Sequence, residues 1–434
     1  MAKISFFIEI GFYLLVAYLP FQLALNLAPD IDLLSGRLFI LGLFGFWLLT
    51  NLFGQKPSWS KNLSGFSLSL FFLIASVSLL IAENQFWAGR KLFLFFSVFP
   101  LYFLTSNLIN NQEKIKKLIW VIAGGAALSA LIALGQFLAQ FVFGLRTMVD
   151  FWGEKIAPYF LGRSFSQLVA ANPSWLVETG GHSLMRAIGL FPDPHMLAFY
   201  LGLILPIVLV SAIFNKSKKF KFILFLIFCF LSLVLALTFS RGAYLGVLIS
   251  LAVVLLLGWR YLAAPDKKFL ARFLLLVGVF LIIFGSPIMG RFISSFDLSE
   301  GSNLGRLAIW QSALKIWQEQ PILGVGLGNY PLAIDFSENY RNPMTSHNLY
   351  LDILVELGIF GLLAWLVIFF GAFKNLAGRI KDNFLAIGLI GSLVYFCVHS
   401  FFETAIFNPT ILAFLMIILG VIRPITTKNR RVAQ

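Results

Sequence analysis

Repeated apolar runs of about 20 residues are the feature that most limits how this chain can fold. A helix needs about 20 apolar residues to cross roughly 30 Å of hydrocarbon, and the 434-residue sequence contains many such runs between polar clusters. Only 12% of the residues are charged, whereas soluble domains carry about a quarter. The runs are continuous rather than alternating, which favours helices over a β-barrel. The sequence therefore predicts an all-α polytopic membrane protein and excludes a water-soluble globule.

The apolar runs predict about twelve transmembrane helices. The expected spans are residues 4–28, 36–53, 65–82, 91–108, 118–143, 196–214, 220–239, 242–258, 270–290, 347–373, 384–402 and 406–422. The first run exceeds the apolar core of a signal peptide, so we interpret it as an uncleaved helix. We expect six regions: helices 1–5 in 1–143, an external loop in 144–195, helices 6–9 in 196–290, a large external loop in 291–346, helices 10–12 in 347–422, and a cytoplasmic tail in 423–434.

Basic residues are distributed unevenly between the two predicted faces. With the N-terminus inside, the cytoplasmic segments hold 21 of the 33 basic residues, whereas the short outer connections hold four. This asymmetry follows the positive-inside rule and predicts that both termini are cytoplasmic. The net charge of +14 is then mostly explained by topology. Nucleic acid is therefore not expected as a partner.

The two long outer segments are expected to carry short helices on the membrane surface. Leu304 to Glu319 has apolar residues at three-to-four spacing with polar residues between them, and Pro321 follows. A similar mixture runs from Ile156 to Val177, broken by Pro158 and Pro173. Loops of this length inside a compact domain are usually functional.

Two sequence features suggest cofactor chemistry only weakly. Gly324-Val-Gly326-Leu-Gly328-Asn329 lacks the spacing of a phosphate-binding loop and has no preceding strand, so we interpret it as a flexible turn after the surface helix. The four histidines share no metal-type spacing, and both cysteines lie in apolar runs. We expect no metal, no other cofactor and no disulfide framework.

Several arginines lie at the outer ends of spans. Arg241, in Ser240-Arg241-Gly242, stands between two apolar runs, where an arginine normally has an anionic partner or lines a wet cavity; snorkelling to the headgroups is the alternative. Arg186 and Arg306 lie close to span ends, and Arg90 lies in another outer connection. Converging guanidinium groups suit a diphosphate, although Arg186 and Arg306, each taken alone, fit a solvated surface arginine better.

A polar helix face opens the tenth predicted span. Asn348, Asp352 and Glu356 are spaced by four residues and share one face, with His347 beside it. We expect this face to line an aqueous pocket. His347 is a candidate general base, because histidine exchanges a proton near neutral pH. An N-cap or interfacial role is the competing interpretation.

The order of these motifs resembles the O-antigen ligase and O-antigen polymerase superfamily. The resemblance covers roughly residues 180–370, and it rests on motifs that follow one another along the chain: Arg186 to His195, Phe239-Ser-Arg-Gly-Ala-Tyr244, Gly305-Arg306, Gly324 to Tyr330, Ser346-His-Asn-Leu-Tyr-Leu351 and Glu356 to Leu362. Where family sequences often read His-Pro-Asn, this chain reads Asp193-Pro-His195, which leaves the role of that segment open.

The resemblance implies a GT-C glycosyltransferase of polysaccharide and lipopolysaccharide biosynthesis in the bacterial cell envelope. It would lie in the inner (plasma) membrane with an external, periplasmic active site, and use a glycan on undecaprenyl diphosphate without a metal and with inversion. By resemblance, the catalytic residues are His347, Arg241 and Arg306. We add Arg186, Asn348, Glu356 and Arg90 as expected substrate-binding residues.

The same sequence features are compatible with other functions. In the ligase branch the acceptor is a hydroxyl on a lipid, and in the polymerase branch it is another lipid-linked repeat. A flippase for lipid-linked sugars is the main alternative from another class. Broken spans and charges near the membrane midplane are typical of transporters, whereas in this sequence the polar face lies at the outer ends of spans. A membrane scaffold gives no reason for Arg241 to lie between spans.

Overall fold

The computed structural model is mostly helical, with two short β-hairpins. It describes residues 2–28, 31–52, 63–170, 173–268, 270–271, 290, 301–338 and 345–426. The N-terminal half contains α1 (Ala2–Tyr18), α2 (Ser35–Leu52), α3 (Leu63–Val77), α4 (Gln85–Val98), α5 (Pro100–Leu108), α6 (Gln112–Phe143), α7 (Leu145–Phe151), α8 (Ala157–Leu161) and α9 (Arg163–Ala170). The remainder contains α10 (Pro194–Ile213), α11 (Lys218–Ala236), α12 (Arg241–Gly258), α15 (Gly301–Glu319), α16 (Tyr330–Ile334), α17 (Leu349–Ala377), α18 (Leu385–His399) and α19 (Pro409–Thr426).

Most of the predicted spans coincide with helices. Within the described residues, seven helices are long and apolar enough to cross a membrane, and three shorter apolar helices accompany them. The ninth predicted span, 270–290, lies almost wholly outside the described residues. The structure therefore supports a multi-pass membrane protein, while the count of twelve spans stays a prediction.

The first predicted span, 4–28, is wrong at its C-terminal end. Helix α1 gives way to a 3-10 turn at Leu19–Phe21, which contains Pro20. The chain then forms strand β1 (Ala24–Ala28), which pairs antiparallel with β2 (Ile31–Leu34). Proline lacks the backbone N–H that a continuing helix needs, so the apolar residues after it form a hairpin instead.

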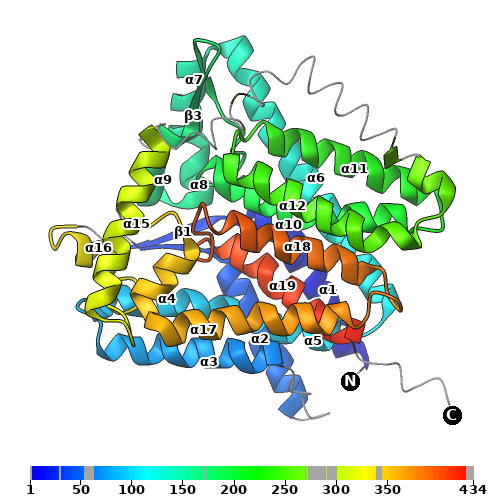
Figure 1. Cartoon of the computed structure of the whole chain (residues 1–434), viewed down its shortest axis with the longest axis horizontal. Helices are drawn as coiled ribbons and strands as arrows, with labels where there is room; N and C mark the ends of the chain where they lie inside the picture. The colour runs from blue at the N-terminus through cyan, green and yellow to red at the C-terminus, as the bar shows by residue number, and fades with distance from the viewer. Residues whose placement is uncertain are drawn as a thin grey trace.

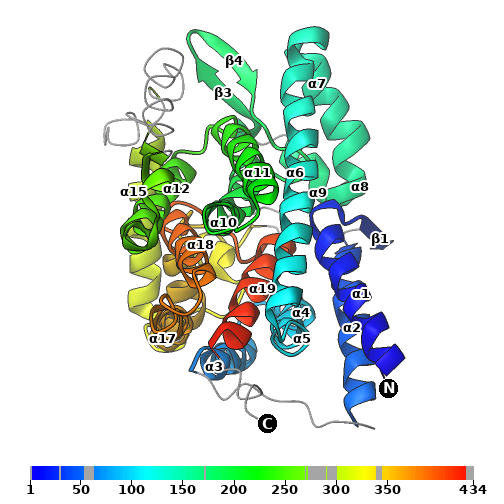
Figure 2. The same ribbon diagram turned by 90° about the vertical axis from the view of Figure 1, so that its right-hand side faces the viewer.

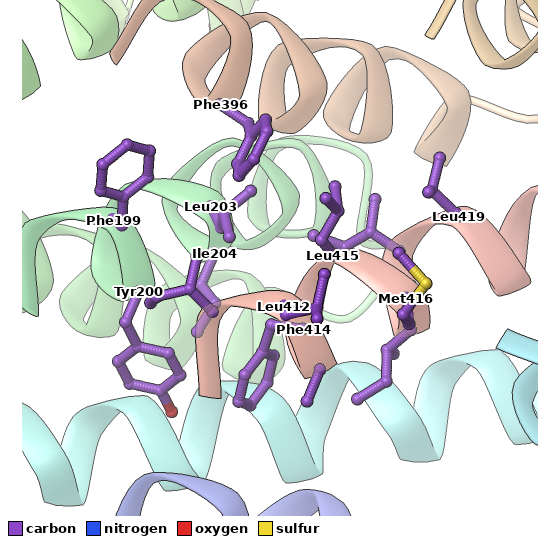
Figure 3. Packing of buried hydrophobic residues seen from close by; sticks show 14 of the residues in the cluster. Phe199, Tyr200, Leu203, Ile204, Phe396, Leu412, Phe414, Leu415, Met416 and Leu419 are labelled. Carbon is purple, nitrogen blue, oxygen red and sulfur yellow. The ribbon is translucent and has the colours of Figure 1, made fainter. Parts of the chain in front are cut away.

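Helix α10 lies at the centre of the hydrophobic core. In its apolar window 89% of the residues are buried, and Phe199, Tyr200, Leu203 and Ile204 meet residues of α18 and α19 (Figure 3). Gly202 allows close contact with α18, because a Cβ there would lie 2.0 Å from the ring of Tyr395. Small residues allow such close helix packing within membranes. The core thus fixes the relative positions of the helices that carry the site.

The two long segments gather at one end of the helix bundle. Helices α7 to α9, strand β3 (Leu176–Thr179) of the β3–β4 (His182–Met185) hairpin, α15 and α16 lie towards one end, whereas α1 begins and α19 ends towards the other (Figure 1). Short helices were expected in 156–177 and are present, but strand β3 begins within that range. Helix α15 confirms the helix expected from Leu304 to Glu319 and runs across α17 rather than along it (Figure 2).

Helix α17 is broken where the glycine-rich loop meets it. Gly358 has a φ of 64° and a ψ of −169°, outside helical geometry. The loop supplies the missing partners: Val325 and Gly326 donate backbone N–H groups to the carbonyls of Val355 and Glu356 at 2.9 and 3.0 Å. In return, Ile359 N–H donates to the carbonyl of Pro321 at 2.9 Å. The loop is therefore a buried wedge, and the expectation of a flexible turn was wrong.

Candidate functional site

Two loops at the end of the bundle bring His347 against Glu403. His347 precedes α17, and Glu403 lies in the connection between α18 and α19. The Nδ1 atom of His347 is 3.0 and 3.2 Å from the two carboxylate oxygens of Glu403. Since a carboxylate accepts hydrogen bonds, Nδ1 carries the proton and Nε2 keeps its lone pair when the ring is neutral. This is the arrangement of a histidine base oriented by an acid.

Asp352 joins these two loops. Its carboxylate accepts a hydrogen bond from Ser346 N–H at 2.7 Å and another from the Thr404 hydroxyl. The N–H of Leu349 donates to the carbonyl of Ser400 at 2.9 Å. Asp352 is buried and does not line an aqueous pocket as expected. Its contacts instead hold the His347 loop beside the Glu403 loop.

The electrostatic surroundings differ between His347 and Glu403. The side chain of His347 is 44% exposed, whereas that of Glu403 is 11% exposed. The Glu403 charge and its hydrogen bond raise the pKa of His347 above its usual range, against the opposing effects of burial and of Arg306. Burial alone would raise the pKa of Glu403, but His347, His195 and Arg306 together hold it below its usual range. The pair is therefore an ionised acid beside a histidine that binds its proton more tightly than usual.

Backbone strain is concentrated at the same place. Among the described residues, Phe239 and His347 have positive φ without being glycine, at 50° and 51°. Histidine tolerates this region better than phenylalanine does. Strained backbone recurs at functional sites, and here it sets the direction of His347 and of the turn that leads into Ser240.

Arg306 lies close to the pair of His347 and Glu403. It is on α15, and Trp310 of the same helix donates its indole N–H to the carbonyl of Ser346 at 3.0 Å. The charge of Arg306 acts on both His347 and Glu403. The structure therefore brings together the arginine and the histidine that the sequence analysis selected as catalytic.

Arg241 and Arg186 lie beside the turn that precedes α12, next to the site. Arg241 is the first residue of α12, and the hydroxyl of the preceding Ser240 is 2.9 Å from Nδ1 of His195. Arg186 is buried, and its guanidinium donates to the carbonyls of Thr238 and Ser174 at 2.6 and 3.0 Å. Both arginines thus adjoin the turn that leads into α12.

The other expected substrate-binding residues already have structural contacts. Asn348 caps α17, since its side chain accepts hydrogen bonds from the N–H groups of Tyr350 and Leu351. Glu356 is buried and forms an ion pair with Lys91 at 2.9 Å. Arg90 precedes Lys91 on α4 and lies over the ring of Phe86. Contact of these three residues with a substrate stays a prediction.

Glu403 and the nearby His195 and His399 were not predicted as site residues from the sequence. The charge of Glu403 interacts electrostatically with both His195 and His399. Glu403 is an acid in the short connection between two apolar helices, and that isolation was the available signal. Within the described residues no group of three or more histidine, cysteine, aspartate or glutamate residues is arranged to hold a metal ion.

Comparison with known proteins identifies the central segment. Residues 225–366 match the family model described as O-antigen ligase, a range that includes Arg241, Arg306 and His347. This segment is therefore similar to the O-antigen ligase family. A protein of Rickettsia conorii (strain ATCC VR-613 / Malish 7), described as a candidate polysaccharide ligase, is 27% identical over 207 residues, which cover 44% of this chain and 48% of that protein. The chain thus spans about half the length of this relative.

The match confirms the resemblance drawn from the sequence motifs. The apolar helices indicate a multi-pass membrane protein, and its central segment is similar to ligases of polysaccharides. Glu403, His195 and His399 lie outside the matched residues 225–366. The candidate site is therefore assembled from the matched segment and from the helices on either side of it.

Proposed function

We propose that this chain is a membrane glycosyltransferase that moves a glycan from undecaprenyl diphosphate to a hydroxyl group on an acceptor. The observation that supports it best is the hydrogen bond between His347 and Glu403, on which the charge of Arg306 also acts. This arrangement supplies a base for a hydroxyl and a cation for a diphosphate, which are the two requirements of the reaction.

The proposed reaction is a single displacement at the first carbon of the donor sugar. Nε2 of His347 takes the proton of the acceptor hydroxyl as its oxygen forms a bond to that carbon. The bond from the carbon to the diphosphate oxygen breaks, and the lipid diphosphate leaves with the electron pair. Attack from the face opposite the leaving group inverts the configuration at the carbon. Glu403 stabilises the imidazolium that forms, as the acid does in a catalytic triad.

The arginines would stabilise the charge that develops on the leaving group. A guanidinium binds two phosphate oxygens at once, and such fixed charges act strongly in a site that excludes water. We assign this role to Arg306 and Arg241, because Arg306 acts on the base and Arg241 begins the neighbouring α12. Two nitrogens of Arg186 already bind backbone carbonyls, so we expect it to support the turn at Thr238 as well as any phosphate.

The external face is the proposed side of the reaction. Helix α15, which carries Arg306, lies towards the end of the bundle where the two long segments gather, away from the start of α1 and the end of α19 (Figure 1). The positive-inside pattern predicts that those two termini are cytoplasmic. We therefore propose an active site on the outer face of the bacterial inner membrane.

A flippase for lipid-linked glycans is the second candidate, and the break in α17 is the observation that favours it. Transporters often bind substrate at discontinuous helices. In this chain, however, the loop that follows α15 binds the carbonyls at the break. A ligase is preferred to a polymerase because the matched family and the Rickettsia relative are both described as ligases.

A reconstitution assay separates the enzyme from the flippase. Purified protein in lipid vesicles would receive an undecaprenyl-diphosphate glycan, a glycan acceptor and a chelator. We expect cleavage of the sugar-diphosphate bond and a new glycan on the acceptor. Transfer of intact donor between leaflets without cleavage would contradict the proposal and favour the flippase.

A further inference from the structure

A chain of hydrogen bonds runs from the buried end of α18 to the start of α10. The Tyr395 hydroxyl is 2.6 Å from the carbonyl of Ala198 and 3.0 Å from Nδ1 of His399. Nε2 of His399 is 3.4 Å from the hydroxyl of Ser240, and that hydroxyl is 2.9 Å from Nδ1 of His195. Three helices, α10, α12 and α18, therefore meet through four polar side chains.

The carbonyl at one end fixes the direction of every hydrogen bond in this chain. A carbonyl only accepts, so the Tyr395 hydroxyl donates its proton to Ala198, and Nδ1 of His399 must donate to the tyrosine oxygen. In a neutral His399 the Nε2 atom then accepts from the Ser240 hydroxyl. The serine oxygen in turn accepts from Nδ1 of His195, which leaves Nε2 of His195 without a proton.

The surroundings of His399 favour the neutral ring. Its side chain is fully buried, and its ring stacks on that of Phe199 with centroids 3.8 Å apart. Burying an unpaired charge is costly, and in the described residues His399 makes hydrogen bonds to Tyr395 and Ser240 but to no carboxylate. A neutral His399 gives the hydrogen bonds from Tyr395 to His195 this one direction.

His195 differs from His399 because it is partly exposed. It lies at the start of α10, where Asp193 accepts hydrogen bonds from the N–H groups of His195 and Met196 and so fixes the backbone. Within the described residues Nε2 has no hydrogen-bond partner, and the charges of Glu403 and Arg306 act on the ring. His195 is therefore a fixed acceptor at the edge of the proposed site.

We propose that Nε2 of His195 binds a sugar hydroxyl or acetamido N–H of a substrate glycan. This inference rests on the proposed glycosyl transfer and adds a sugar-binding position to it. A lone pair repels phosphate oxygens and attracts hydrogen-bond donors, so the position suits the sugar and not the diphosphate. The sugar belongs either to the donor or to the acceptor, and both present the same chemistry.

The tautomer of His195 can be measured without any activity. The chain has only four histidines, so 15N labelling of histidine in the full-length protein in lipid nanodiscs gives few signals, assigned by single replacements. We expect both His195 and His399 to carry the proton on Nδ1 at neutral pH. In Ser240→Ala, His195 should become a mixture of tautomers while His399 keeps its proton on Nδ1.

Ser250→Ala is the matched control for this experiment. Ser250 is also buried on α12, and its hydroxyl donates to the carbonyl of Gly391 on α18, with no histidine involved. We expect this variant to leave the His195 signals unchanged. A proton on Nε2 of His195 in the unmodified protein would overturn the inference.

Binding measurements identify the sugar. In the donor arm, the probes are undecaprenyl diphosphate N-acetylglucosamine and undecaprenyl diphosphate without a sugar. In the acceptor arm, the KM of the glycan acceptor is measured in the transfer assay. His195→Ala should weaken the binding of one of the two glycans by about 10- to 100-fold, which is the effect of one lost hydrogen bond in a desolvated site. The affinity for the sugar-free lipid should not change. His195→Gln, which can place an acceptor oxygen near the same point, should recover most of the loss.

The two proposals fail in different ways. If His195→Ala weakens neither glycan, or weakens the sugar-free lipid equally, the sugar-binding role is wrong even when transfer proceeds. If the unmodified protein never transfers a glycan, the proposed function is wrong, while the tautomer and the donor arm still give their own answers.

Discussion

At the residue scale, the site depends on a contact between side chains that lie far apart in the sequence. His347 and Arg306 were predicted from motifs near them, because a histidine and an arginine at span ends are chemically conspicuous. Glu403 was not predicted, since it lies 56 residues from His347 and nothing local indicates the contact. The capping role of Asn348 was foreseeable from its place at the start of α17, but its polar-face position suggested a pocket instead.

The pH dependence of transfer should report the interaction between Glu403 and His347. Because Glu403 raises the pKa of His347, the unprotonated base forms only at a higher pH than usual, and the rate should rise with pH through that raised value. In Glu403→Gln, burial and Arg306 still lower the pKa, so the rising limb should move to lower pH and the maximal rate should fall. A pH profile that does not move would show that Glu403 does not act on the base.

The arginine assignments can be tested by lysine substitutions, which keep the positive charge but remove the guanidinium group that binds two phosphate oxygens. In Arg306→Lys and Arg241→Lys, transfer should drop sharply while the protein still inserts and accumulates, because lysine cannot bind two phosphate oxygens in the same way. Arg260→Lys is a matched control beyond the other end of α12 and should keep normal transfer. Near-normal transfer in both site variants would favour snorkelling arginines.

At the element scale, the apolar runs located most helices but not their irregularities. Helices α2, α10, α11, α12 and α18 lie close to their predicted spans, because a continuous apolar run leaves few other structures in lipid. The break in α17 could not be predicted, since Gly358 interrupts the helix only together with a distant loop that binds the exposed carbonyls. The glycine motif indicated unusual backbone without indicating where the loop would pack.

The packing of the glycine-rich loop against α17 predicts that one added methyl group at Gly326 strongly lowers the stability of the protein. At Gly326 the φ is 95°, and a Cβ would lie 2.6 Å from Cα of Ala82. Gly326→Ala should therefore destabilise the protein by about 2 kcal/mol or more, from the left-handed backbone and the overlap together. Thermal unfolding in detergent measures the effect.

Gly305→Ala is the comparison for this prediction. Gly305 lies on α15, where an added Cβ meets nothing within 4 Å. Alanine is favoured over glycine in a helix by up to about 1 kcal/mol, so this variant should be as stable as the original protein or more stable. Equal melting temperatures for the two variants would contradict the wedge.

At the scale of the whole molecule, the account depends on which end of the bundle faces the cytoplasm. The basic residues predict that the end with α1's first residues and α19's last residues is inside. Reporter fusions at Lys218, the first residue of α11, and at Ser337, after α16, should therefore report opposite sides, with Ser337 outside. Fusions that report the same side would contradict the topology and the proposed external site.

The central claim is that His347 accepts the hydroxyl proton during glycan transfer, and its most direct test compares unmodified protein with His347→Ala. Both proteins would be supplied with an undecaprenyl-diphosphate glycan and a glycan acceptor, and both donor retention and product formation would be measured. A positioned base usually contributes about 10²- to 10⁴-fold to the rate, so we expect product formation to fall by that factor while donor binding is retained. Product formation at the normal rate by His347→Ala would contradict the account.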